Sequence, residues 1–148
     1  MAASKWQVYD EAKKYLLTGD IDLNTSAMRM KICKGTKAAA VSNYTRSTFA
    51  SLTHETTNIF TPLRTLTNIA VTAGASAKEI KFDFDDEIWT ASGGAVNSIQ
   101  YAVIGVSGGK ALAWCKLSTA AINISDGSTL TITINASGAF TLTGGSTA

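Results

Sequence analysis

The segment from Ile80 to Leu142 constrains the fold most strongly, because apolar and polar residues alternate there in a series of short runs. Successive side chains of a β-strand point to opposite faces, so this period of two gives each run one apolar and one polar face. Glycine-containing pairs separate the runs and supply the positive φ that tight turns require. The expected strands are Ile80–Phe84, Val96–Val106, Ala111–Leu117, Leu130–Ile134 and Ala139–Thr143, and the turns contain Gly93-Gly94, Gly108-Gly109 and Asp126-Gly127.

These runs predict a mainly β protein, specifically an antiparallel β-sandwich or jelly-roll-like domain, because the apolar faces must pack on a second sheet or on another chain. The 148 residues fit one domain spanning 1–148. Charged residues make up only 16% of the chain, below the usual ~25%. Thr, Ser and Asn carry the remaining polarity, and they favour strands and turns.

The stretch from Ser4 to Leu17 predicts one N-terminal amphipathic helix. Ser4 is a suitable N-terminal cap, and Gly19 follows the last apolar residue, where a left-handed C-terminal cap is common. Packing of the apolar stripe on the protein's own sheet is the default, and a surface for a partner is the alternative. The stripe comprises Trp6, Tyr9, Ala12 and Leu16.

The stretch from Ala27 to Cys33 predicts another alternating strand. Its basic residues Arg29 and Lys31 are expected on the solvent face, opposite an inward face formed by Met28, Met30 and Ile32. The densest basic stretch runs from Arg29 to Lys37 and is interpreted as the solvent face of a strand, with a phosphate-binding patch as the alternative. With a net charge of only +2, we expect no nucleic-acid partner.

The remaining N-terminal half has weaker patterns. Residues 21–23 predict a brief strand, and the segment from Leu63 to Val71 alternates weakly enough to predict one more. Residues 34–47 show no pattern and predict a long loop. Because long loops in compact domains are uncommon unless functional, this loop is a candidate for contact with a partner.

Cys33 and Cys115 each lie inside an expected strand, so we expect buried free thiols in a protein made in a reducing cytoplasm. The chain has no apolar stretch of signal-peptide or membrane-span length, so no membrane is expected as a partner.

Catalytic and metal motifs are not apparent. The single histidine, His54, has no nucleophile that the sequence places on it. The acidic run Asp83, Asp85, Asp86 and Glu87 lacks the spacing of a calcium loop and is interpreted as a solvated turn, with an ion site as the alternative. Gly108-Gly109-Lys110 runs into an expected strand, whereas a phosphate loop opens a helix. We therefore expect no enzyme, no cofactor and no metal.

Several segments together carry a resemblance to a known family. They begin with Lys5–Tyr9 and Ile21–Leu23, continue with Asp86–Gly94 and Tyr101–Ile104, and end with Gly127–Ile132 and Ser137–Leu142. In order and spacing the chain resembles small virion structural proteins of tailed bacteriophages, which are variously labelled head decoration, minor structural or tail fibre proteins. The resemblance implies a mostly β particle component that associates with copies of itself and binds other virion proteins.

The function expected from this resemblance is a capsid decoration, or cement, protein that binds and stabilises the shell of the major capsid protein in the virion as a small closed oligomer such as a trimer. A tail or neck component, either an adaptor or a fibre module, is the first alternative. A carbohydrate-binding β-sandwich with Trp89, Trp114 or Tyr101 as an exposed platform is the second. Truncation through Leu17 is expected to abolish capsid binding and leave the sheet folded. The candidate contact residues are Trp6, Tyr9, Tyr15, Lys34, Lys37, Tyr44 and Arg46.

Overall fold

The computed structural model describes residues 4–52 and 63–143, and its fold is mainly β with all strands paired antiparallel. The predicted class, packed antiparallel sheets with an N-terminal helix, is confirmed. In chain order the elements are β1 (Gln7–Val8), α1 (Asp10–Thr18), β2 (Met28–Lys34), the 3-10 helix η1 (Gly35–Lys37), α2 (Ala38–Val41), β3 (Leu63–Thr65), β4 (Ala70–Ala73), β5 (Glu79–Asp83), β6 (Glu87–Thr90), β7 (Val96–Val106), β8 (Ala111–Lys116), β9 (Ile122–Ile124), β10 (Thr129–Ile132) and β11 (Phe140–Thr143).

The largest sheet has the strand order β1-β8-β7-β2-β3, with β9 paired to one end of β7, and we call it the main sheet. Its long central strand β7 pairs with β2 on one side and with β8 on the other. β7 matches the predicted range, and β2 and β8 each differ from theirs by a residue.

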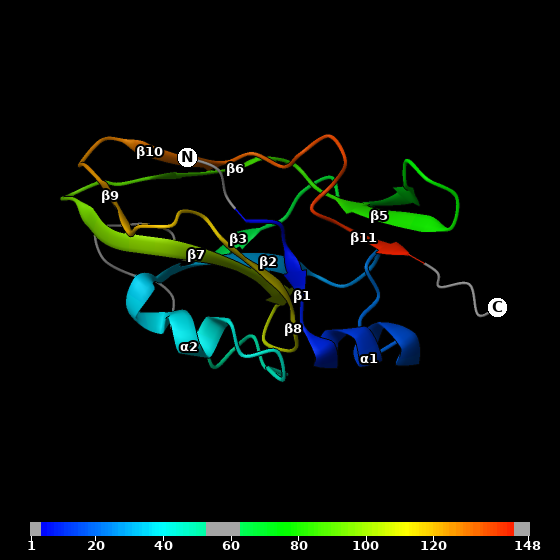
Figure 1. Cartoon of the computed structure of the whole chain (residues 1–148). Helices are drawn as coiled ribbons and strands as arrows, with labels where there is room; N and C mark the ends of the chain where they lie inside the picture. The colour runs from blue at the N-terminus through cyan, green and yellow to red at the C-terminus, as the bar shows by residue number, and fades with distance from the viewer. Residues whose placement is uncertain (1–3, 53–62, 144–148) are drawn as a thin grey trace.

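A second layer lies over one face of the main sheet, and we call it the upper layer (Figure 1). It consists of the pair β10-β6 and the three-stranded sheet β11-β5-β4. Because β5 leads into β6 and β10 leads into β11, the two small sheets form one long ribbon with a break. Hydrogen bonds cross the break from Ile134 N to Asp86 Oδ1 at 2.8 Å, from Ala139 N to Phe82 O at 2.9 Å and from Lys81 Nζ to Ala136 O at 3.2 Å.

α1 and α2 cover the opposite face of the main sheet, which we call the helix side (Figure 1). The central strands are therefore enclosed from both faces, and near-continuous burial is typical of strands enclosed in this way. In the register, Met30, Ile104 and Ala113 share one face, and all three are fully buried. On the other face Lys31 lies beside Val103, and both are buried as well.

The burial of Lys31 corrects the prediction that it faces solvent. Its side chain is 3% exposed, and its ammonium group donates hydrogen bonds to the carbonyl oxygens of Phe49 at 2.6 Å and Leu52 at 3.1 Å. The Phe49 ring lies 4.3 Å from the same nitrogen. The prediction that Lys31 lies on the face of β2 opposite Met30 and Ile32 is correct. That face is buried, however, because the segment after α2 folds back over it.

The predicted helix over Ser4–Leu17 is also corrected, because α1 begins only at Asp10. The residues before it are extended, with Trp6 and Val8 half-buried and Gln7 exposed between them. Ser4 pairs with Lys116 through its backbone N–H and its hydroxyl rather than capping a helix. The three-residue spacing between Trp6 and Tyr9 is compatible with a helix, but the alternation of Trp6, Gln7 and Val8 is equally compatible with a strand. The predicted left-handed cap at Gly19 is confirmed, with φ at 76°.

Residues 34–47 are not the long loop that was predicted. β2 extends to Lys34, η1 and α2 follow, and only the residues after Val41 are irregular. The brief strand predicted at 21–23 is a turn. The weak strand predicted from Leu63 to Val71 is two strands, β3 and the start of β4, which belong to different sheets.

Two strands of the C-terminal half were not predicted. β6 begins at Glu87, the last residue of the acidic run, and β9 pairs with β7. Both strands are short, at four and three residues. Alternation of apolar and polar residues can be recognised only over a longer run, so these two strands gave no clear pattern.

Candidate functional site

The predicted contact residues fall on two surfaces of the molecule. Tyr15 in α1 and Tyr44 and Arg46 after α2 belong to the helix side, whereas the half-buried Lys34 and Lys37 lie at the end of β2 and in η1. Trp6 lies on the other face of the main sheet, where its ring meets Phe84 edge-on at a centroid distance of 6.3 Å. The seven residues therefore do not form one surface.

Tyr9 is fully buried, and this corrects its place among the contact residues. Its hydroxyl donates a 2.7 Å hydrogen bond to the carbonyl oxygen of Val41 in α2. Burial raises the pKa of this phenol well above its ordinary value. The backbone N–H of Asp10 donates to the carbonyl of Tyr44 at 2.9 Å. Tyr9 and Asp10 therefore tie the start of α1 to α2 and to the segment after it, and the buried Tyr9 offers no surface to a partner.

Arg46 is a half-buried residue whose guanidinium group is used within the fold. Its Nε donates to the carbonyl oxygen of Ala40 at 2.6 Å, and its Nη1 lies 3.3 Å from the hydroxyl of Ser51. A carbonyl in the last turn of a helix lacks an intrahelical partner, and a basic side chain commonly satisfies it. Arg46 is thus a C-terminal cap for α2.

Tyr15 belongs to a small ionic cluster at the end of α1. The Lys110 ammonium lies 4.5 Å from the centroid of the Tyr15 ring and 3.0 Å from Asp20 Oδ1. Thr18 donates a 2.6 Å hydrogen bond to the other oxygen of Asp20. This hydrogen bond, followed by the contact with Lys110, lowers the pKa of the Asp20 carboxyl below its usual range.

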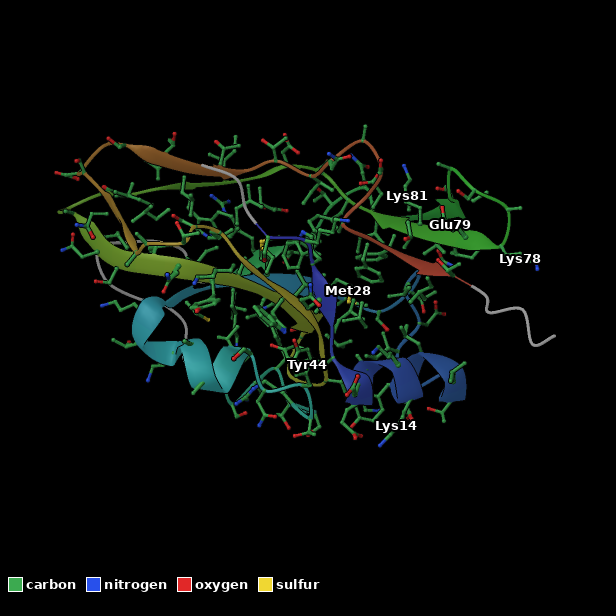
Figure 2. All side chains as sticks on the ribbon, in the orientation of Figure 1. Lys14, Met28, Tyr44, Lys78, Glu79 and Lys81 are labelled. Atoms are coloured by element: carbon green, nitrogen blue, oxygen red, sulfur yellow. The ribbon has the colours of Figure 1, made fainter. Side chains whose placement is uncertain are left out.

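Two large apolar side chains on the helix side face solvent. Leu17, in the last turn of α1, is 89% exposed, and Tyr44, after α2, is 53% exposed. Figure 2 shows Tyr44 and the nearby α1 residue Lys14 on this side of the molecule. Lys14 and Lys13 pair with Glu11 and Asp10 along the helix, so the apolar groups lie among paired charges.

A cavity of about 640 Å³ opens between the layers, at the edge of the sandwich. One wall is the extended segment Ser4, Lys5 and Trp6, which leads into the edge strand β1. The other wall is the chain from the end of β10 to the start of β11, and the floor includes Cys115 and Leu117 of the main sheet. No sequence motif pointed to this cavity, because its walls come from opposite ends of the chain.

Each acidic residue of the run from the end of β5 to the start of β6 has its own structural role. Asp83 forms a 3.0 Å ion pair with Lys81. Asp85 accepts hydrogen bonds from Thr67 and Asn68 at 3.0 and 2.7 Å. Together with the bond from Asp86 across the ribbon, these contacts separate the carboxylates. Within residues 4–52 and 63–143, no three His, Cys, Asp or Glu residues lie together as metal ligands would.

Glu87 is the buried member of this run, at 7% exposure. Burial raises the pKa of its carboxyl, and the neighbouring Arg64 partly opposes that effect. Arg64 extends from β3 of the main sheet, donates to the carbonyl of Ile88 at 2.5 Å, and lies 6.0 Å from the Trp89 ring. This cluster connects the edge of the main sheet to β6. The interpretation as a solvated turn is wrong for Glu87.

The aromatic platform proposed from the sequence is not formed by two of its three residues. Trp89 is fully buried, and Tyr101 is 6% exposed. Trp114 is half-buried, packs against Tyr101 at a centroid distance of 6.2 Å, and has an indole nitrogen with no partner in the described chain.

The two cysteines are buried and free, as predicted. Burial is the main reason why the pKa is raised to about 11 for Cys33 and to about 12 for Cys115. Both thiols are therefore protonated and unreactive at neutral pH.

Two further observations concern what the described chain contains. His54 lies outside the described residues. None of the helices in residues 4–52 and 63–143 has the length and apolar character that crossing a bilayer requires.

Comparison with protein-family models, with curated proteins and with solved structures finds no match to this chain.

Proposed function

We propose that this protein is a structural component of a tailed-bacteriophage virion, namely a capsid decoration protein that binds the major capsid protein through its helix side. The observation that carries the proposal is the exposure of Leu17 and Tyr44 among paired charges on this side. A contiguous apolar patch rimmed by polar residues is typical of a surface that binds another protein, and Leu17 and Tyr44 are the apolar groups that such a patch on the helix side would use. The resemblance described above supports a virion protein as that partner.

The architecture suits a decoration protein with a rigid binding surface. The main sheet is enclosed by the upper layer and by the helices, so the helix side rests on a packed core and not on a loop. A ligand that binds only the assembled shell stabilises it by mass action. Many copies of a small protein, each bound weakly, therefore strengthen a shell. Self-association into a small closed oligomer such as a trimer belongs to the same proposal.

The first test is the number of copies of the protein in purified virions, measured by quantitative mass spectrometry against the major capsid protein. A ratio close to one to one is expected for a protein that covers the capsid lattice. A few copies per particle would refute the decoration role and favour the tail or neck alternative. Absence from particles would refute a virion role.

The second test locates the binding surface. The double variant Leu17→Gln/Tyr44→Ser is expected to bind shells that lack the protein at least about tenfold more weakly, because burial of one large apolar side chain contributes ~1.5–3 kcal/mol. The matched control is Ile88→Thr, since Ile88 is 50% exposed but lies in β6 of the upper layer. Loss of binding in the control alone would place the interface on the upper layer.

A further inference from the structure

We propose that the cavity at the edge of the sandwich is a saccharide-binding site. This activity is separate from the proposed binding to the capsid, because the cavity lies on the other face of the main sheet from the helix side. Its volume of about 640 Å³ lies within the range of about 300–1,000 Å³ that is usual for small-molecule sites.

The floor of the cavity is apolar. Cys115 and Leu117 line it from the main sheet, and Ile132 and Phe140 line it from the upper layer. Each of these four residues is at most 9% exposed. At the rim Trp6 is half-buried, and its indole N–H forms no hydrogen bond with the described chain. An aromatic ring with a free polar edge offers a ligand both an apolar surface and a donor.

The wall from Thr133 to Thr141 supplies neutral polar side chains. The hydroxyls of Thr133, Ser137 and Thr141 make no hydrogen bond to the described part of the chain, although all three residues line the cavity. The Asn135 Oδ1 accepts the backbone N–H of Ser137 at 2.9 Å, which leaves its amide N–H₂ as a donor. These groups can donate and accept around an apolar floor.

That combination fits the chemistry of a sugar. A pyranose ring has a face of C–H groups and an edge of hydroxyls, so it needs an apolar or aromatic surface beside groups that both donate and accept hydrogen bonds. Among the described residues that line the cavity there is no carboxylate, and Lys5 is the one cation. The site therefore suits a neutral saccharide or one that carries a carboxylate.

An extended peptide fits this cavity less well. Addition of a strand uses free backbone N–H groups along an edge. On the wall between β10 and β11 these groups are already engaged: the N–H groups of Ile134, Ser137, Gly138 and Ala139 all donate within the protein. On this wall the groups that remain free are side chains, namely the hydroxyls and the Asn135 amide, which favours a saccharide.

The experiment is saturation-transfer NMR on the full-length protein with glucose, rhamnose, N-acetylglucosamine and glucuronic acid, and with cellobiose and chitobiose. We expect transfer to at least one sugar. Thr133→Val and Thr141→Val keep the shape of the side chain and remove one hydroxyl each, and each is expected to weaken binding about fivefold. Thr72→Val, at an exposed site in β4 away from the cavity, is the matched control and is expected to bind normally.

The outcomes separate clearly. No transfer to any of these sugars, or transfer that Thr133→Val and Thr141→Val leave unchanged, overturns the proposal. Binding of a mixture of short random peptides in place of the sugars, with the same sensitivity to the two variants, overturns it in favour of a peptide site. Because Leu17→Gln/Tyr44→Ser does not touch the cavity, it is expected to bind sugar normally even where it no longer binds shells.

Discussion

Gly105 shows how closely one residue can determine packing in this protein. It lies in β7, and a Cβ atom placed there would be 2.6 Å from the carbonyl oxygen of Lys110 and 2.6 Å from a ring carbon of Phe49. The Phe49 segment also receives the Lys31 ammonium. The absence of a side chain at Gly105 therefore lets this segment close over the helix side of the main sheet.

We predict that Gly105→Ala lowers the free energy of unfolding by about 1–3 kcal/mol, the usual cost of overpacking a core. Gly109→Ala is the matched control, because the nearest atom there is 3.7 Å away and the φ angle is not positive. Urea unfolding of both variants measures the difference. Equal stability of the two variants would show that the Phe49 segment can move away without cost.

Glu87 predicts a pH dependence whose sign follows from burial. Because its pKa in the folded protein is raised above the ordinary 4.5, the folded state binds more protons than the unfolded state just above that pH. The free energy of unfolding must then fall as the pH rises through this window. Glu87→Gln removes the dependence.

We therefore predict that the stability of Glu87→Gln relative to the parent protein increases from pH 4 to pH 7, measured by urea unfolding at each pH. The comparison between pH values cancels any effect of the substitution that does not depend on pH. Asp126→Asn is the control, because Asp126 is exposed and is not among the charged groups that shift the pKa of Glu87. An opposite trend would mean that the charge of Arg64 outweighs the burial of Glu87.

At the scale of elements, the segment from Ser4 to Thr18 is part of the core and not an appendage. β1 pairs with β8, and Tyr9 and Ala12 are fully buried. This placement removes the structural basis for the expectation that truncation through Leu17 leaves the sheet folded.

We predict that a chain beginning at Gly19 loses cooperative thermal unfolding. Loss of one large buried aromatic side chain typically costs ~3–5 kcal/mol, which is a large share of the ~5–15 kcal/mol that stabilises a typical domain. Near-UV circular dichroism and calorimetry would measure the effect, with Leu17→Gln as the control that retains the native signal. A native-like transition in the truncated chain would show that the sheets fold without this segment.

At the scale of the whole molecule, stability is expected to be graded between the layers. β7 is paired on both sides and covered on both faces, whereas β4 is an edge strand whose residues are half-buried or exposed. Amide groups exchange most slowly where burial and pairing are most complete.

Native-state hydrogen exchange followed by mass spectrometry is accordingly predicted to give the strongest protection in β2, β7 and β8, and weaker protection in β4 and β10. Amide exchange in the central strands is expected to require global unfolding of the protein, whereas exchange in the ribbon of the upper layer is expected to require only local opening. Uniform protection of both layers would instead indicate that they unfold as one unit.

The sequence by itself determined the strands that are long and strongly alternating, the turns that need glycine, and the buried state of both cysteines. These properties are local, since side-chain alternation and positive φ depend on residues close in the chain. β7 was predicted to the residue, and β2 and β8 were predicted nearly so.

Only the tertiary structure decided which faces are covered and which residues meet. Lys31 is buried because the segment containing Phe49, 18 residues away in sequence, folds back over its ammonium group. Trp6 is extended because the strand that follows it, β1, pairs with the edge of β8 and because the Trp6 ring packs against Phe84. The cavity joins residues 4–6 to residues 132–141, and Tyr9 turns inward to reach Val41. Such contacts depend on how distant segments pack, which the local pattern of apolar and polar residues does not encode.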